Sequence, residues 1–114
     1  MSDMFSRCKN LESIDLSSFN TSNVTQMKDM FAYCESIKDL DLSNFNTENV
    51  RYMRNMFCGC INLERLDLSS FDMENIINME NMLSDCPKLN NLDFNHFIYD
   101  ENYSWLASDK DDDC

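Results

Sequence analysis

The chain has 114 residues, of which 43% are hydrophobic, enough for one domain with a continuous core. Its 21 acidic and 9 basic residues give a formal net charge of −12, so its field repels nucleic acids and anionic lipid surfaces. No apolar run approaches the ~20 residues of a membrane span, and the opening stretch MSDMFSRCKN lacks the apolar segment of a signal peptide. We therefore expect neither nucleic-acid binding nor membrane insertion.

A step of 26 residues recurs along the chain without any insertion. It joins sets of apolar residues: Met4, Met30, Met56 and Met82; Cys8, Cys34, Cys60 and Cys86; Leu11, Ile37, Leu63 and Leu89; Leu16, Leu42, Leu68 and Phe94; and Phe19, Phe45, Phe71 and Phe97. A constant period in this range is typical of a solenoid whose coils stack in register. The sequence therefore predicts one domain of about four 26-residue coils over residues 1–97.

Two kinds of element are expected in each coil. Met27, Met30, Phe31 and Cys34 lie at positions i, i+3, i+4 and i+7, which one face of a helix gathers together. Residues 27–34, 53–60 and 79–86 are therefore predicted to form short helices or helical turns.

A short strand follows each of these segments. The stretch 40–42, Leu-Asp-Leu, alternates apolar and polar residues with period two, which predicts buried leucines and an outward aspartate. Stacked coils would place these strands side by side and parallel, with the helices covering the other side. The predicted fold class is thus an α/β repeat, with parallel short strands on one face and short helices or helical turns on the other.

The repeat pattern LxxLDLSxFNTxNVxxMxxMFxxC reads here as IKDLDLSNFNTENVRYMRNMFCGC and resembles the BspA-like leucine-rich-repeat surface proteins over residues 4 to about 97. The resemblance implies a right-handed leucine-rich-repeat solenoid and a role in adhesion or surface interaction. It also implies a location at the cell surface or outside the cell, although the sequence shows no signal or anchor.

The last part of the chain departs from the repeat. In residues 98–107, Tyr99, Tyr103, Trp105 and Leu106 are expected to fold over the last coil as a cap, which open-ended solenoids need. Residues 108–114, SDKDDDC, are expected to form a disordered acidic tail.

An aspartate recurs at the centre of every predicted strand: Asp15, Asp41, Asp67 and Asp93. Like charges on neighbouring strands repel one another, so some partner should neutralise them. Hydrogen bonds from Ser17, Ser43 and Ser69 are one explanation, and a row of calcium ligands is the other. We favour the serines because calcium loops gather several ligands within one short segment. No metal or cofactor is expected.

Members of this aspartate row and the residues beside them are the recognition candidates. The resemblance points to the concave sheet face as the binding surface, since leucine-rich repeats commonly bind there. The candidate residues are Asp39, Asp41, Ser43, Arg65, Asp67, Ser69, Asn91 and Asp93. A solvated polar face without a partner is the competing explanation.

The cysteines and the single histidine do not suggest catalysis. Cys8, Cys34, Cys60 and Cys86 fall on the apolar face and are predicted to be buried free thiols, whereas Cys58 and Cys114 are expected to be more exposed and oxidisable. His96 has no repeated partner, and no nucleophile–base set or metal cluster is recognisable. We therefore expect no enzyme.

The sequence thus favours a non-enzymatic interaction or adhesion module that binds another protein or a cell-surface or matrix component. The alternative is a repeat scaffold or spacer with no ligand of its own. Met4, Phe5 and Cys8 lie at an uncapped end, so the coils are also expected to stack end to end as dimers.

Overall fold

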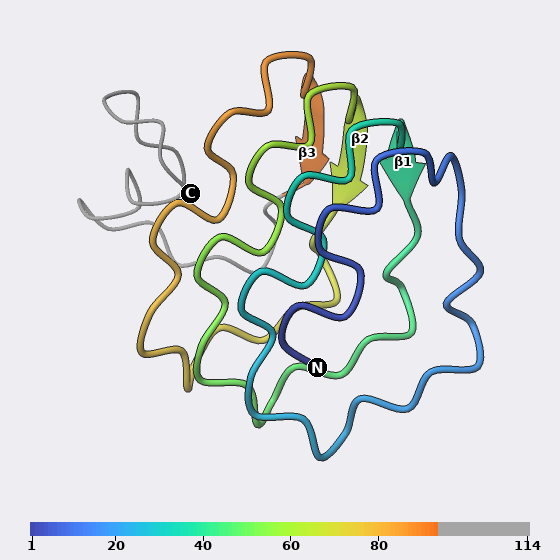
Figure 1. Cartoon of the computed structure of the whole chain (residues 1–114). Helices are drawn as coiled ribbons and strands as arrows, with labels where there is room; N and C mark the ends of the chain where they lie inside the picture. The colour runs from blue at the N-terminus through green and yellow to red at the C-terminus, as the bar shows by residue number, and fades with distance from the viewer. Residues whose placement is uncertain (94–114) are drawn as a thin grey trace.

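The computed structural model describes residues 1–93, and these wind round a common core in successive, closely similar turns of the chain (Figure 1). Three short strands, β1 (Asp39–Leu40), β2 (Arg65–Asp67) and β3 (Asn91–Asp93), form a parallel sheet in the order β1-β2-β3. Asp39 pairs with Arg65, which pairs with Asn91, so strand residues 26 positions apart in the sequence are neighbours in the sheet. The predicted cap at 98–107 and tail at 108–114 lie outside the described residues, as do Phe94 and Phe97.

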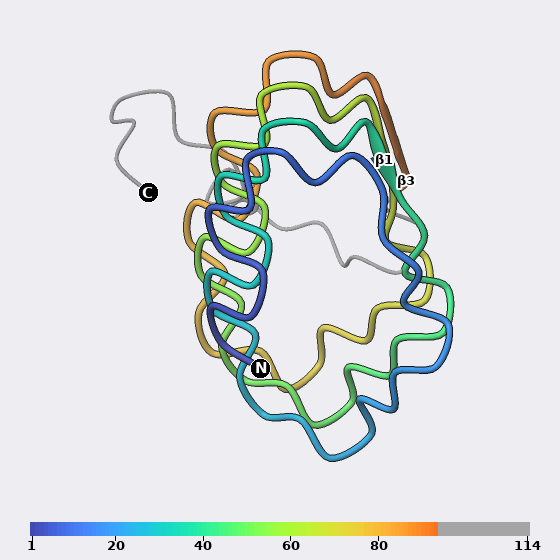
Figure 2. The same ribbon diagram turned by 45° about the vertical axis from the view of Figure 1, so that its right-hand side comes forward.

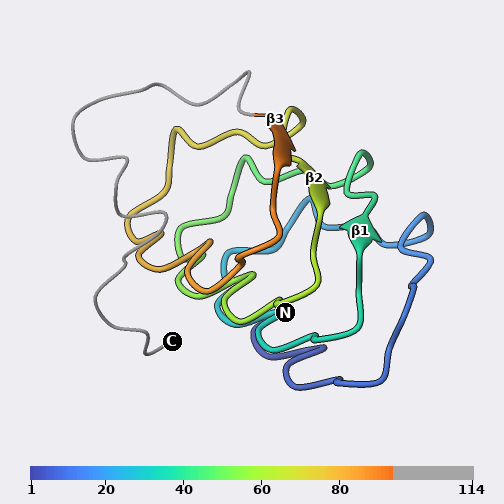
Figure 3. The same cartoon turned by 90° about the horizontal axis from the view of Figure 1, so that it is seen from above.

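A second ladder runs along the side opposite the sheet, as Figures 2 and 3 show. We call it the turn ladder; it comprises residues 1–8, 27–34, 53–60 and 79–86. Alternate N–H groups donate to the next winding: Met27 to the Tyr52 carbonyl, Asp29 to that of Arg54 and Phe31 to that of Met56, at 2.8, 3.0 and 2.8 Å. The N–H groups between them close tight turns three residues back.

The predicted fold class is wrong. Residues 1–93 contain no α-helix, and their strands are only two or three residues long. The α/β leucine-rich-repeat solenoid of four coils is therefore not what forms; the chain is a small globule measuring 35 × 32 × 22 Å. The segments predicted to be helical, 27–34, 53–60 and 79–86, form the turns of the turn ladder.

Positive backbone φ angles explain why these segments are not helical. Two residues in each turn segment adopt the left-handed conformation, the first being an aspartate or asparagine. They are Asp3, Asp29, Asn55 and Asn81, followed four residues later by Arg7, Tyr33, Gly59 and Asp85. A left-handed residue every four positions interrupts a right-handed helix, and it turns alternate N–H groups toward the neighbouring winding. Asp and Asn tolerate this conformation well, so the recurrence of one or the other every 26 residues was the sequence signal for turns in place of helices.

The core follows the predicted pattern of inward and outward residues. Leu40 and Leu42 are buried while Asp41 is exposed, as the alternation predicts. The Phe45 and Phe71 rings, 26 residues apart, stack with centroids 6.5 Å apart, whereas the Phe19 ring is tilted against Phe5. A second stack, Phe5, Phe31 and Phe57, has centroid separations of 5.5 and 5.7 Å.

Buried threonines join the windings on a third side of each turn of the chain. Thr47 is 1% exposed; its hydroxyl accepts a hydrogen bond from the Asp72 N–H at 2.7 Å and donates to the Asp72 carbonyl at 3.1 Å. Thr21 makes the same pair of bonds with Asn46, one winding earlier. One hydroxyl thereby satisfies two backbone groups that the irregular chain leaves without a ladder partner.

Replacement of Thr47 by valine should destabilise the protein by about 1–3 kcal/mol, because the Asp72 N–H and carbonyl lose their partner in a largely water-free position. Urea unfolding followed by circular dichroism measures the change. Thr25→Val is the matched control, since the Thr25 side chain is exposed and its hydroxyl has no bond within residues 1–93. Equal losses in both variants would contradict the role given to Thr47.

Candidate functional site

The sheet carries the residues predicted to bind. Asp39, Asp41, Ser43, Arg65 and Asp67 are exposed, and Ser69 is half-buried. Asn91 and Asp93 lie in β3, where their backbones pair with Arg65 and Asp67. The fold therefore brings together the rows that the 26-residue step predicted. We call this surface the strand face.

The aspartate row of the strand face is held by the neighbouring serines. The Asp41 carboxylate accepts hydrogen bonds from the Ser43 hydroxyl at 2.7 Å and from the Ser43 N–H at 3.0 Å. Asp15 and Ser17 repeat both bonds, and the Ser69 N–H donates to Asp67 at 2.8 Å. Bonds first from the serine hydroxyl and then from its N–H lower the pKa of Asp15, Asp41 and Asp67. The prediction of serine partners is confirmed for these three aspartates.

Ser43→Ala should raise the pKa of Asp41 toward its ordinary value, because the hydroxyl bond is the larger cause of the lowering. A lowered carboxyl pKa stabilises the fold above the unfolded-state pKa, and this contribution disappears as the pH falls through the folded-state value. The variant should therefore lose less stability on acidification than the wild type. Carboxyl-carbon NMR titration measures the pKa, and Ser18→Ala is a control because that exposed serine makes no bond to an aspartate. An unchanged Asp41 titration would contradict the assignment.

The charges of Asp39 and Arg65 remain available to a partner. These neighbours in the sheet are exposed, and neither forms an ion pair within residues 1–93. The one ion pair shorter than 4.0 Å in that range joins Arg54 to Glu80. The row that contains Asp39 and Arg65 changes chemistry from winding to winding, whereas the row of Asp15, Asp41 and Asp67 does not. The former is consequently the part of the strand face whose side chains differ between windings.

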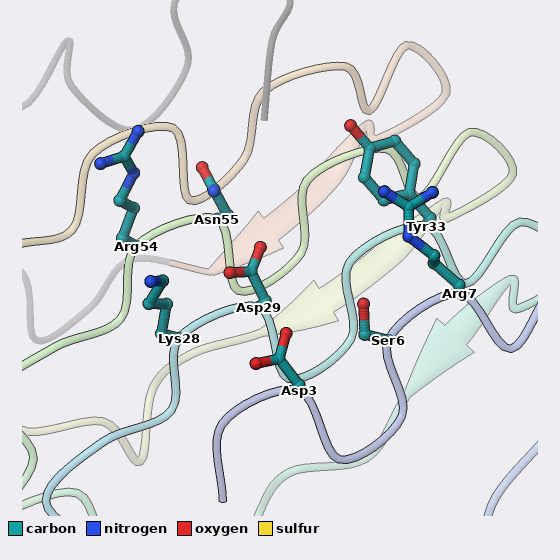
Figure 4. A pocket seen from close by; sticks show the side chains of 8 residues that line it. All are labelled: Asp3, Ser6, Arg7, Lys28, Asp29, Tyr33, Arg54 and Asn55. Carbon is teal, nitrogen blue, oxygen red and sulfur yellow. The ribbon is translucent and has the colours of Figure 1, made fainter.

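A groove that the sequence reasoning missed lies on the turn ladder (Figure 4). It has a volume of about 410 Å³ and is lined by Asp3, Ser6, Arg7, Lys28, Asp29, Tyr33, Arg54 and Asn55. Figure 4 shows Asp3, Asp29 and Asn55 in one line along the stack, each from a different winding. Lys28 and Arg54 lie to one side of this line, and the Arg7 guanidinium lies 4.8 Å from the centre of the Tyr33 ring on the other. The line follows the positions of positive φ.

Asp29 carries a conflict of interactions at the centre of this groove. Partial burial raises the pKa of Asp29, and the Asp3 carboxylate adds to the rise. Hydrogen bonding by the Asn55 side chain opposes it, as do the charges of Lys28 and Arg54. The charged form of Asp29 is therefore disfavoured in the folded protein.

Asp29→Asn should stabilise the protein at neutral pH by about 0.5 kcal/mol, a small effect because the carboxylate is only partly buried. Asparagine already occupies the equivalent positions 55 and 81 with positive φ. A raised carboxyl pKa destabilises the fold as the pH rises through it, so the gain should vanish below about pH 4. Thermal unfolding from pH 3 to 8 tests this, with the exposed Asp72→Asn as control. A pH-independent gain would contradict the electrostatic cause.

A family model matches residues 1–103, and its description reads Mycoplasma protein of unknown function, DUF285. The chain belongs to this family. No curated protein and no solved structure matches the sequence. The family description mentions neither binding nor adhesion, so the function of this DUF285 chain has to be argued from its surfaces.

The cysteine row of this DUF285 chain is structural. Cys34, Cys60 and Cys86 are free thiols that donate to the carbonyls of Phe5, Phe31 and Phe57, each at 3.1 Å. Burial raises the pKa of Cys34 to about 11 and that of Cys86 to about 12, and it also raises that of Cys60. High pKa values keep thiols protonated and unreactive.

Two further sequence expectations concern exposure and metals. Cys58 was expected to be exposed and oxidisable; it is fully buried in the turn ladder, and it is disulfide-bonded. Cys114 lies outside the described residues. His96 lies outside them too. Within residues 1–93 no three His, Cys, Asp or Glu side chains are grouped so as to hold a metal ion, and no helix is long and apolar enough to cross a bilayer.

Proposed function

We propose that this DUF285 chain is a non-enzymatic binding module that uses its strand face to engage another protein or a cell-surface or matrix component. The observation that carries the proposal is the exposed Asp39–Arg65 row, which forms no ion pair within residues 1–93, beside an aspartate row whose carboxylates already accept hydrogen bonds from serines. Charged groups without partners of their own are free to pair across an interface, where they favour one partner over another.

Net charge limits the kind of partner. At a formal charge of −12, the chain is attracted to cationic surfaces and repelled by anionic ones. Asp39 and Asp41 add local negative charge to the strand face, while Arg65 requires an acidic or carbonyl group at one point of the partner. A basic protein surface with one acidic position fits this pattern.

The alternative function is a scaffold or spacer without a ligand. The interactions within residues 1–93 also suit that role, because almost every repeated polar side chain is used to join or shape the windings. The variable Asp39–Arg65 row is the feature that favours binding, since a pure spacer has no need for side chains that differ between windings.

The double charge reversal Asp39→Lys/Arg65→Glu tests the proposal and leaves the net charge unchanged. Wild type and variant are compared for binding to purified cell-surface and matrix proteins, coated individually and chosen to span basic and acidic surfaces. We expect the wild type to bind at least one basic protein and the variant to bind it at least about tenfold more weakly, since unlike charges become like charges.

A second double reversal, Arg51→Glu/Glu74→Lys, is the matched control, because both residues are exposed, lie outside the sheet and also conserve net charge. Equal losses in the two variants would indicate general electrostatics and contradict a strand-face site. Absence of wild-type binding to the whole panel would favour the spacer.

A further inference from the structure

The amide oxygen of Asn55 is a buried hydrogen-bond acceptor that the fold leaves open. The Asn55 side chain is 5% exposed and lines the groove on the turn ladder (Figure 4). Within residues 1–93 its Oδ1 atom has no hydrogen-bond partner. Buried polar atoms in native proteins nearly always have one, so an exception inside a groove indicates a place where a bound molecule donates.

The next winding shows why this acceptor is open. Asn81 is the equivalent of Asn55 one winding later, and its Oδ1 atom accepts a hydrogen bond from the Ser84 hydroxyl at 3.0 Å. The residue equivalent to Ser84 in the Asn55 winding is Cys58, which is disulfide-bonded and therefore has no thiol hydrogen to donate. The same acceptor is thus satisfied from within the fold at Asn81 and is left for an external donor at Asn55.

The neighbouring acceptor is the Asp29 carboxylate, which favours a donor with positive charge. The Asn55 side chain hydrogen-bonds Asp29, so the two groups are adjacent. Partial burial raises the pKa of Asp29, and the Asp3 carboxylate adds to the rise. An ammonium group carries a positive charge and three N–H donors. It would therefore satisfy Asn55 Oδ1 and stabilise the charged form of Asp29 at the same time.

Two cations beside these acceptors limit the ligand further. Lys28 and Arg54 directly precede Asp29 and Asn55 in the sequence, are exposed, and line the same groove. Arg54 lies 3.9 Å from Glu80, whereas Lys28 forms no ion pair within residues 1–93. The two cations repel a lone ammonium group, so the ligand needs an anionic group next to it.

The spacing of the two rows limits the distance between the charges of the ligand. Consecutive residues have Cα atoms about 3.8 Å apart, so the cation row and the acceptor row run close beside each other. An ammonium group and a carboxylate on one carbon atom match this arrangement, and that is the geometry of an α-amino acid. The groove volume of about 410 Å³ lies within the range of small-molecule sites.

We propose that the groove binds a free α-amino acid. Its ammonium group donates to Asn55 Oδ1 and to the Asp29 carboxylate, and its carboxylate accepts hydrogen bonds from Lys28 and Arg54. The two groups together carry no net charge, so the formal charge of −12 does not oppose their approach. The groove lies on the side of the molecule opposite the sheet, so this site is separate from the strand face (Figure 2).

Ligands of a single charge fit the groove less well. A divalent cation would meet Lys28 and Arg54, and within residues 1–93 no three His, Cys, Asp or Glu side chains are grouped so as to hold a metal ion. A phosphate or sulfate would meet Asp3 and Asp29 and would leave Asn55 Oδ1 without a donor. A molecule that offers both charges satisfies the acceptors and the cations together.

Titration of the full chain with each of the twenty common L-amino acids tests the proposal. Binding is measured by isothermal titration calorimetry and by the shift of the Asn55 side-chain amide signals in NMR spectra. We expect at least one amino acid to bind with a Kd below about 1 mM. Its carboxamide, which keeps the ammonium group but not the carboxylate, should bind at least about tenfold more weakly, and so should its N-acetyl derivative, which keeps the carboxylate alone.

The two derivatives also decide between the proposal and other occupants of the groove. Equal binding of the carboxamide would indicate recognition of an amine, such as a peptide N-terminus, and would overturn the proposal. Equal binding of the N-acetyl derivative would indicate a simple anion site and would overturn it as well. So would the absence of binding by all twenty amino acids at about 10 mM.

Asp29→Asn separates binding from folding. This variant is expected to be slightly more stable than the wild type at neutral pH, yet it removes the negative charge that the ammonium group meets. It should bind the same amino acid at least about tenfold more weakly, whereas the exposed Asp72→Asn should bind it as the wild type does.

Lys28→Gln tests the carboxylate end of the site and should weaken binding by a similar factor. Lys38→Gln is its matched control, because Lys38 is also exposed but does not line the groove. Wild-type binding by Asp29→Asn or Lys28→Gln, or equal losses in either variant and its control, would overturn the assignment of the site. None of these measurements depends on whether the strand face binds a partner.

Discussion

The hydrogen bonds between successive windings at a constant offset are the constraint on which the rest of the molecule depends. Residues 1–93 contain no helix and have to satisfy their buried N–H and carbonyl groups in some other way, because each unpaired group inside a protein is costly. Here the sheet, the turn ladder and the Thr21 and Thr47 hydroxyls do so on different sides of each winding. An inserted residue would shift all of these contacts at once, which explains why the 26-residue step is uninterrupted.

The same constraint places identical or similar side chains next to one another in successive windings. It therefore decides which charged side chains already have a partner within the fold. In the aspartate row, like charges become neighbours, and the fold resolves the conflict with a serine two residues on. In the turn-ladder groove, partial burial raises the pKa of Asp29 and the neighbouring Asp3 carboxylate adds to the rise, while hydrogen bonding by Asn55 opposes it. Asp39 and Arg65 have neither a serine partner nor an ion pair within residues 1–93, and the proposed binding role of the strand face rests on these two charges.

The sequence by itself determined the period, the residues that face inward and the neighbours in each row, because an exact repeat leaves only one register for stacking. Leu40, Leu42 and Phe45 were placed correctly, and so were the serine partners of the aspartates, since these follow from local spacing. Only the tertiary structure decided that residues 27–34 are turns: the spacing of Met27, Met30, Phe31 and Cys34 suits a helix equally well, and the left-handed Asp29 and Tyr33 direct alternate N–H groups to the next winding. The groove and the single direction of the turn-ladder bonds arise from that choice, which is why apolar periodicity could not reveal them.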